Sequence, residues 1–389
     1  MRRVLLVDTG FSAEPIYRAL KSKGLEVFTI GRRSQDLLAS GYSRYICSDY
    51  SKLDDVRAAI KQHQIEMLVP GCTDKSYEVC SQLAQEFGFP GFESCESLVR
   101  IHNKLEFRRL CEGLEIPVPA VFECINGALE FNQPVMVKPI DSYSGRGLTK
   151  VEHATEIALQ SAISIAKKES PSSAFLIEEF VSGDLFSFSA FLVGGNVVTS
   201  FCVAEYGFIN PFAVDVSYVA KNNPFHDSLT QNVELIANAL SISSGLIHLQ
   251  YIVNGQNYWL IEATRRCPGD LYASLIRHST GYPYAEAYLS PFIEEPPSSA
   301  TCGQEKCIVR QTVMADRAGK HYGIVFDIAA NLIALHPTVA IGGHLEPGHS
   351  GRAGIAFYNL GEESSLRNFI DSLRGGGGVY LSIMDTNDG

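Results

Sequence analysis

Residues 247–266 have the sequence IHLQYIVNGQNYWLIEATRR. Two apolar, β-branched runs flank an Asn-Gly dipeptide typical of tight turns, so the sequence predicts a β-hairpin. Pairing across the turn is expected to place Gln250 and Glu262 on neighbouring strands, with their side chains pointing the same way. Oxygen donors in this arrangement suit Mg²⁺, which takes few protein ligands beside the oxygens of a polyphosphate. Arg266, four residues past Glu262, is expected to offset the charge of a transferring phosphoryl group.

A glycine-bearing segment lies upstream, at residues 134–148. Lys138 ends an apolar strand there, and a second strand follows the glycines. The small residues between the two strands include Ser142, Ser144, Gly145 and Gly147. A strand, a glycine loop and a lysine at its base can lay backbone N–H groups along a polyphosphate. The segment is not a P-loop, because GxxxxGK[ST] is absent and no helix follows. An ordinary hairpin explains the same residues about equally well.

The segment 175–191 contains a third group of candidates. They are Glu178, Glu179, Phe180, Val181 and Asp184. Two acids end an apolar strand beside an aromatic residue, and such acids can bind the amino edge of adenine and the ribose hydroxyls. Solvated carboxylates at a strand end are the alternative interpretation.

The bulk composition excludes several classes of protein. The chain has 389 residues, a formal net charge of −11 and a pI near 5.4, without a long basic run, which argues against nucleic-acid binding. No window approaches the roughly 18 apolar residues that a membrane span needs. The ten cysteines are scattered singly, which favours free thiols in the cytoplasm over a zinc site or a redox dithiol.

The first seventy or so residues alternate short apolar runs with amphipathic segments, which predicts a parallel sheet covered by helices. The run at residues 4–7 ends in DTGFSAEP, which has a single glycine and lacks GxGxxG. A dinucleotide site is therefore not expected there.

Taken in order along the chain, these segments resemble the ATP-grasp superfamily, and within it the carboxylate–amine ligases. The resemblance covers about residues 1–290 well and the C-terminal region loosely. It implies an α/β and α+β protein, in which a parallel α/β N-terminal (pre-ATP-grasp) domain precedes a two-lobed ATP-grasp fold. The expected parts are residues 1–97 for the N-terminal domain, 98–183 for the small lobe, and 184–389 for the large lobe with a C-terminal extension.

The same resemblance implies roles for individual residues. Lys104 and Lys138 match the two phosphate-facing lysines, and the loop from Ser142 to Gly147 matches the flexible loop over the phosphates. The adenine and ribose contacts match Glu178, Phe180, Val181 and Asp184. The metal ligands match Gln250 and Glu262, and the catalytic cations match Lys138 and Arg266.

Two positions depart from the usual ATP-grasp pattern. The first metal position, usually an acid, is Gln250, and the asparagine of the usual E-x-N triplet is Thr264. Both changes lower the negative charge around the metal, so the binding of a second Mg²⁺ is in doubt.

The implied reaction is that of an ADP-forming ligase using ATP and Mg²⁺, with Mn²⁺ as a substitute. A small-molecule carboxylate becomes an acyl-phosphate, and an amine such as an amino acid then forms an amide bond, in small-molecule or natural-product biosynthesis. Segment 205–223 is a candidate for the substrate pocket, with an ordinary packed hairpin as the alternative. Segment 342–354 has the composition of a lid-type loop, in which Arg352 is a candidate to face the substrate. Three alternatives stay open: an ATP-grasp protein with lost or altered catalysis, a biotin-carboxylase-like enzyme, and a phosphotransferase. A homodimer is a family expectation.

Overall fold

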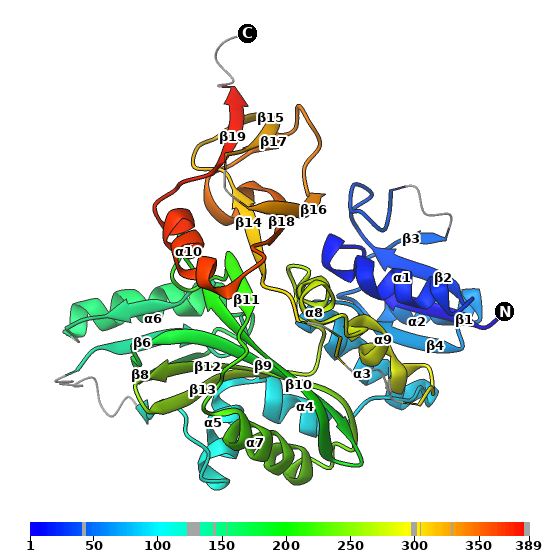
Figure 1. Ribbon diagram of the computed structural model, residues 1–389. Helices are drawn as coiled ribbons and strands as arrows, with labels where there is room; N and C mark the ends of the chain where they lie inside the picture. The colour runs from blue at the N-terminus through cyan, green and yellow to red at the C-terminus, as the bar shows by residue number, and fades with distance from the viewer. Residues whose placement is uncertain are drawn as a thin grey trace.

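A computed structural model of the protein describes residues 1–40, 44–122, 133–142, 145–153, 155–296, 302–303, 305–327 and 330–384. Figure 1 shows an N-terminal sheet on one side, a long central sheet, a small sheet on the other side, and a C-terminal extension above them. Within the described ranges, no helix is both long and apolar enough to cross a membrane.

The N-terminal part is a parallel sheet with the strand order β3-β2-β1-β4, as the alternating pattern predicts. Its strands are β1 (Arg3–Val7), β2 (Glu26–Gly31), β3 (Tyr45–Cys47) and β4 (Met67–Pro70). Its helices are α1 (Glu14–Ser22), α2 (Leu53–His63) and α3 (Asp74–Phe87). Both faces of β1 are buried: Val4 and Leu6 enter one core, and Leu5 and Val7 enter another. A continuous apolar run is therefore stable here because helices cover both sides.

The small sheet has the order β5-β8-β6-β7 and carries helix α6 on one face. These elements are β5 (Val121–Phe122), β6 (Val135–Pro139), β7 (Thr149–Val151), α6 (Glu156–Glu169) and β8 (Phe175–Glu179). Val135 and Val137 pack against α6. Because side chains alternate along a strand, Lys138 projects from the opposite face of β6.

The central sheet is antiparallel, with the order β13-β12-β9-β10-β11-β14-β18-β16. Its strands are β9 (Asp184–Val193), β10 (Asn196–Tyr206), β11 (Val216–Val219), β12 (Ser244–Asn254), β13 (Asn257–Thr264), β14 (Ile308–Met314), β16 (Asn331–Pro337) and β18 (Arg352–Asn359). Leu249 and Tyr251 join a core with helix α7 (His226–Ala239). The alternation of β12 turns Gln250 toward the other face of the sheet.

Further elements connect these sheets and extend the C-terminus (Figure 1). The connecting helices are α4 (Cys95–His102), α5 (Lys104–Gly113), α8 (Tyr272–Thr280) and α9 (Tyr284–Leu289), and the 3₁₀ turns η1 (Phe11–Ala13) and η2 (Ser290–Phe292) flank α1 and α9. The C-terminal elements are β15 (Gly319–Phe326), β17 (His344–Leu345), η3 (Gly348–Gly351), η4 (Glu363–Ser365), α10 (Leu366–Arg374) and β19 (Val379–Met384). The expected boundary at residue 97 falls inside α4.

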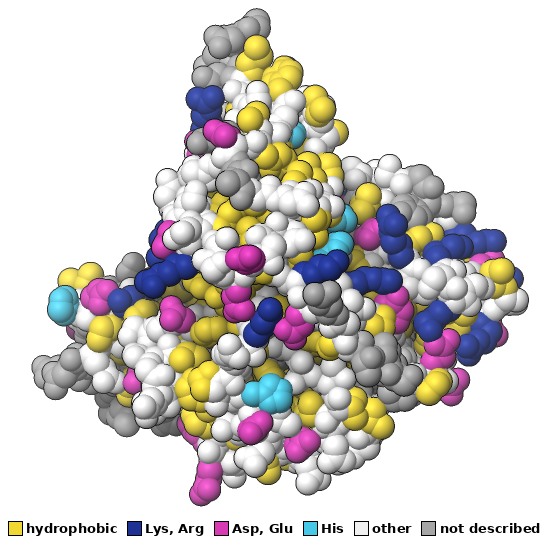
Figure 2. All heavy atoms as spheres, viewed as in Figure 1, with side chains coloured by type: hydrophobic (Ala, Val, Ile, Leu, Met, Phe, Trp, Pro, Cys, Tyr) yellow, Lys and Arg dark blue, Asp and Glu magenta, His cyan; other side chains and the backbone are white. Residues whose placement is uncertain are grey.

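The face of the molecule in Figure 2 carries acidic and basic side chains interspersed across its centre. This view of the surface lacks a continuous basic stripe along its middle, the feature that nucleic-acid binding would favour.

Candidate nucleotide and metal site

The β12–β13 hairpin brings the two predicted metal ligands together. Gln250 pairs directly with Glu262, and the register then shifts, so that Tyr251 faces Leu260. The shift leaves Ile261 as the extra residue of a bulge next to the pair. Both ligands are half-buried. A cross-strand pair holds side chains about 5 Å apart at Cβ, which suits two oxygen donors for one ion.

Lys104 links this hairpin to the glycine loop of the small sheet. Its Nζ lies 2.7 Å from the Ser142 carbonyl oxygen and 3.2 Å from Glu262 Oε1, and the residue is 7% exposed. Asn103 caps the start of α5, because its Oδ1 accepts the N–H groups of Leu105 and Glu106. The cap fixes where α5 begins and therefore where Lys104 points.

Lys138 is buried in an ion cluster with Glu178 and Arg108. Its Nζ is 2.5 Å from Glu178 Oε1, and Arg108 Nε donates to Glu178 Oε2 at 3.0 Å. Arg108 Nη2 also donates to the Ile261 carbonyl oxygen at 2.9 Å, which ties the cluster to the bulge of β13. Burial lowers the pKa of Lys138 to about 8, against the opposing pull of Glu178.

The same cluster engages the side chain of Glu178. The resemblance placed it at the adenine edge, yet its carboxylate is 3% exposed and engaged by Lys138 and Arg108. Its side chain therefore holds Lys138, whose phosphate-facing role stays a prediction. Arg108 was not predicted from the sequence. The sequence signal for it was an arginine pair, Arg108 and Arg109, of which one lies on the apolar face of α5.

The rest of the adenine segment lies at the end of β8. The Glu179 N–H donates to Ala120 O at 2.8 Å, and the Phe180 N–H donates to Pro134 O at 3.2 Å. The Phe180 N–H is therefore already engaged. Its carbonyl oxygen is the backbone group left for the adenine contact that the resemblance implies. Val181 is half-buried, and Asp184 is exposed at the start of β9.

The glycine loop packs against the segment that precedes β11. Gly145 has a left-handed φ of 69°, and a Cβ there would lie 2.4 Å from the Phe212 carbonyl oxygen. The Ser142 hydroxyl donates to Arg146 O at 2.8 Å, which closes the loop on itself. Gly147 also has positive φ, at 75°, whereas Ser144 lies outside the described residues. Only glycine fits the approach at position 145.

Arg266 contacts the N-terminal part of the chain. Its Nε lies 3.0 Å from Asp74 Oδ2, and the Thr264 hydroxyl donates to Asp74 Oδ1 at 3.2 Å. Burial raises the pKa of Asp74, but Arg266 and His102 outweigh burial and hold that pKa below its usual value. Thr264 stands at the position of the usual asparagine ligand, and its hydroxyl thus forms a hydrogen bond with Asp74.

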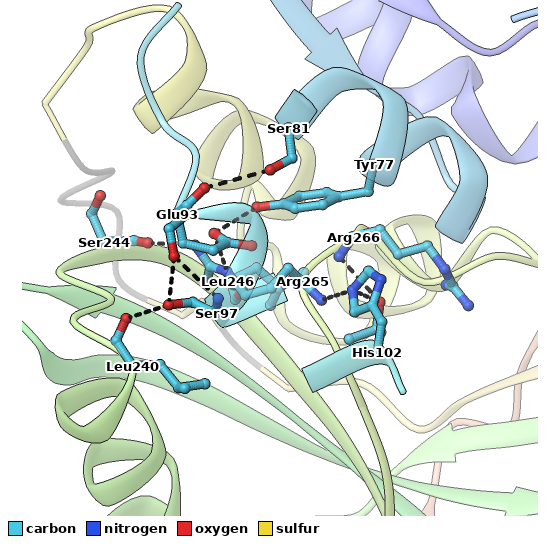
Figure 3. A network of polar contacts seen from close by, with 12 residues as sticks. Tyr77, Ser81, Glu93, Ser97, His102, Leu240, Ser244, Leu246, Arg265 and Arg266 are labelled. Carbon is cyan, nitrogen blue, oxygen red and sulfur yellow. Dashed lines mark hydrogen bonds and ion pairs between the residues drawn. The ribbon is translucent and has the colours of Figure 1, made fainter. Parts of the chain in front are cut away.

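The neighbouring Arg265 has a different environment. It pairs with Glu93 at 3.0 Å in a buried cluster, and Figure 3 shows Arg266 extending away from that cluster. The two adjacent arginines therefore have separate tasks: Arg265 holds α4 and its surroundings to the central sheet, and Arg266 extends toward Asp74.

A second set of charged residues lies on the same face of the central sheet. Glu205 and Arg352 fall within the two segments considered for the substrate pocket, whereas Arg310 and Asp270 were missed. Gln250 Nε2 donates to Glu205 Oε2 of β10 at 2.8 Å. Arg310 Nη1 donates to the Asp270 carbonyl oxygen at 3.0 Å, and Arg352 Nη1 lies 3.0 Å from Asp270 Oδ1. The buried Arg310 Nη2 and Arg352 Nε have no hydrogen-bond partner among the described residues. The sequence signal for Arg310 was its place as a single charged residue within the largely apolar run of β14.

The donor set at the hairpin fits Mg²⁺ bound through a nucleotide. Among the described residues, no three His, Cys, Asp or Glu side chains stand together as a metal site. An ion here would use Gln250, Glu262 and phosphate oxygens, which is the way Mg²⁺ is held in phosphoryl-transfer sites. Buried Lys104 and Lys138 supply the cations that a polyphosphate needs.

Residues 131–273 match the family model of the ATP-grasp domain. This part of the chain is therefore an ATP-grasp domain, as the sequence resemblance predicted. That match contains the glycine loop, the Glu178 segment, the metal hairpin and Arg266.

Curated relatives are similar at low identity. The phosphoribosylamine–glycine ligase of Pyrococcus horikoshii is 24% identical over 292 residues, 68% of this chain and 66% of the relative. The formate-dependent phosphoribosylglycinamide formyltransferase of Mycolicibacterium smegmatis is 23% identical, over 68% of this chain and 69% of the relative. The chain thus spans about two thirds of the length of the curated relatives that it matches.

Solved structures share the fold over nearly the whole chain. The L-amino acid ligase from Bacillus licheniformis has a TM-score of 0.80 at 15% identity, covering 99% of both chains. The phosphoribosylglycinamide synthetase from Anaerococcus prevotii has a TM-score of 0.76 at 14% identity, covering 98% of this chain and 100% of the other. The predicted fold class, a parallel α/β domain followed by a two-lobed ATP-grasp fold, is confirmed.

Proposed function

We propose that the protein is an ADP-forming ligase that activates a small-molecule carboxylate as an acyl-phosphate and couples it to an amine. The observation that carries the proposal is the position of Lys104, between the Ser142 carbonyl of the glycine loop and the Glu262 carboxylate of the metal hairpin. A cation buried there joins the phosphate loop to the metal ligands. The named relatives, a glycine ligase among them, support the same reaction class.

The residues divide the chemistry between them. A carboxylate does not react with an amine at neutral pH, because its oxygen is a poor leaving group; phosphorylation replaces that leaving group by phosphate. Lys138 and Arg266 offset the charge on the transferring phosphoryl oxygens, and the loop from Ser142 to Gly147 excludes water from the acyl-phosphate. Mg²⁺, when bound at Gln250 and Glu262, neutralises phosphate charge, and Mn²⁺ is the expected substitute.

The charged residues beyond the hairpin support an amino acid or a similar zwitterion as a substrate. Arg310 and Arg352 have buried guanidinium nitrogens without partners among the described residues, and these suit a carboxylate. Asp270, held between the two arginines, suits an ammonium group or a proton transfer from the amine. We propose a role in small-molecule or natural-product biosynthesis, which this substrate class would suit.

The experiment is an ADP-release assay with ATP, Mg²⁺ and a panel of amino acids and other carboxylates, offered singly and in pairs. We expect ADP release that depends on a carboxylate, together with a product whose mass is that of the pair minus water. Glu262→Ala should abolish release while the protein stays folded. Tight ATP binding without ADP from any carboxylate would instead indicate lost catalysis and contradict the proposal.

The same assay separates the remaining alternatives. A phosphotransferase would leave a stable phosphorylated product, and a biotin-carboxylase-like enzyme would respond to bicarbonate. We propose the cytoplasm as the compartment, because a reducing environment keeps thiols free and the cysteines that the structure describes are unpaired. A homodimer remains a proposal, which sedimentation would test.

A further inference from the structure

The amide of Gln250 has only one orientation that satisfies its neighbours. Glu205 Oε2 lies 2.8 Å from Gln250 Nε2. Gln250 Nε2 is the donor in this contact, so the amide presents its N–H group to the Glu205 carboxylate. The amide oxygen of Gln250 therefore lies on the side away from Glu205, where a metal ligand is needed.

Glu205 is itself held in place. It is 6% exposed, and the Ser187 hydroxyl bonds to its carboxylate. Ser187 pairs with Gln250 across β9 and β12, and Glu205 pairs with Leu185, two residues from Ser187 on the same face. Glu262, Gln250, Ser187 and Glu205 thus form a polar row across four neighbouring strands.

We propose that Glu205 is a positioning residue for the metal site, which fixes the Gln250 amide and supplies the negative charge that position 250 lacks. The ATP-grasp pattern usually has an acid at the first metal position. In this protein the neutral amide of Gln250 occupies that position. The Glu205 carboxylate accepts a hydrogen bond from this amide. A hydrogen bond to a carboxylate polarises the amide and makes its oxygen a better ligand. This inference rests on the proposed function, because it assumes a metal at the hairpin.

An exchange of the two side chains tests the proposal. Glu205→Gln removes the charge but keeps the shape, and Gln250→Glu places two carboxylates against each other, where they repel. The double variant Glu205→Gln/Gln250→Glu restores one amide and one carboxylate in hydrogen-bonding contact, with their places exchanged. If the two residues act as a unit, the double variant recovers what each single variant loses.

The quantity measured is the affinity of the protein–ADP complex for Mn²⁺. Electron paramagnetic resonance monitors the binding, and no carboxylate substrate is present. We expect Glu205→Gln to weaken Mn²⁺ binding by about tenfold, the usual effect of losing a residue that orients a metal ligand. The double variant should bind Mn²⁺ more tightly than either single variant. Glu234→Gln is the matched control, because Glu234 also bonds to β10, at the Val197 N–H at its far end, and should change nothing.

Two results would overturn the proposal. One is Glu205→Gln binding Mn²⁺ as tightly as the unchanged protein. The other is a double variant no tighter than Glu205→Gln alone. No carboxylate substrate is present, so this measurement does not depend on ligation. If the protein binds Mn²⁺ and ADP but shows no turnover in the ADP-release assay, the proposed function is contradicted. If Glu205→Gln binds Mn²⁺ normally, this inference is contradicted.

Discussion

Lys138 shows how single residues are tuned at this site. It is buried with one carboxylate, Glu178, which Arg108 shares. Removing one member of such a cluster leaves a buried charge uncompensated, a loss of about 3–5 kcal/mol in typical proteins. The cluster therefore fixes the lysine in position while leaving its ammonium group close to losing its proton.

ATP affinity should depend on pH through this lysine. Burial brings the pKa of Lys138 down from its usual value of 10.5 to about 8, so the ammonium is charged below pH 8 and neutral above it. Since a polyphosphate binds the charged form, ATP affinity should fall above pH 8, by up to about tenfold per pH unit. Calorimetric titrations between pH 6.5 and 9.5 would measure this.

Lys138→Met supplies the control for that profile. The variant should bind ATP weakly at every pH and lose the inflection near pH 8. A flat profile in the unchanged protein would show that Lys138 keeps its proton throughout, or that it does not face the phosphates.

At the scale of elements, the strands that carry the site follow from simple sequence patterns. The apolar run of β6 and the Asn-Gly turn between β12 and β13 predict both elements close to their observed bounds. The buried helices α8 and α9 were missed, because a helix that is apolar on most sides lacks the periodic pattern of a surface helix.

The glycine loop gives a prediction at this scale. Gly145→Ala would force a left-handed φ on alanine and drive its Cβ into the Phe212 carbonyl. Gly361→Ala is the matched control, because Gly361 has φ of 74° with no atom within 4 Å of a Cβ. Backbone strain should cost both variants about 1–2 kcal/mol of stability. Gly145→Ala should lose more than Gly361→Ala, because of the added contact with the Phe212 carbonyl.

Only Gly145→Ala should affect the nucleotide. We expect it to raise the KM for ATP and lower kcat, by roughly tenfold in kcat/KM, which corresponds to about 1.4 kcal/mol. Steady-state kinetics and thermal melting of both variants would separate the two effects. Equal kinetics for Gly145→Ala and Gly361→Ala would mean that the loop does not cover the phosphates.

At the scale of the whole molecule, the site is assembled from distant parts of the chain. Asp74 begins α3 of the N-terminal part and pairs with Arg266 of the ATP-grasp region. Glu205 reaches Gln250 because β9 separates their strands in the sheet order β12-β9-β10. Sequence motifs predicted Gln250, Glu262 and Arg266, but partners that depend on strand order or domain packing carry no local pattern.

The contact between the N-terminal part and Arg266 predicts an effect on turnover. Asp74→Asn should leave Arg266 without its ionised partner. We expect kcat to fall by about tenfold with ATP affinity nearly unchanged, because Asp74 would orient a group that we propose for phosphoryl transfer. Glu93→Gln, which breaks the adjacent Arg265 pair, should lower thermal stability while the folded protein keeps its kcat. An unchanged kcat in Asp74→Asn would show that Arg266 needs no such support.

In the proposed reaction, a carboxylate oxygen receives the γ-phosphoryl group of ATP. Once the panel has identified a carboxylate substrate, that substrate labelled with ¹⁸O on both oxygens tests the claim most directly. Mass spectrometry of the released phosphate should find one ¹⁸O atom per product formed, because the acyl-phosphate leaves its bridging oxygen on phosphate. Phosphate without ¹⁸O, at normal product yield, would contradict the account.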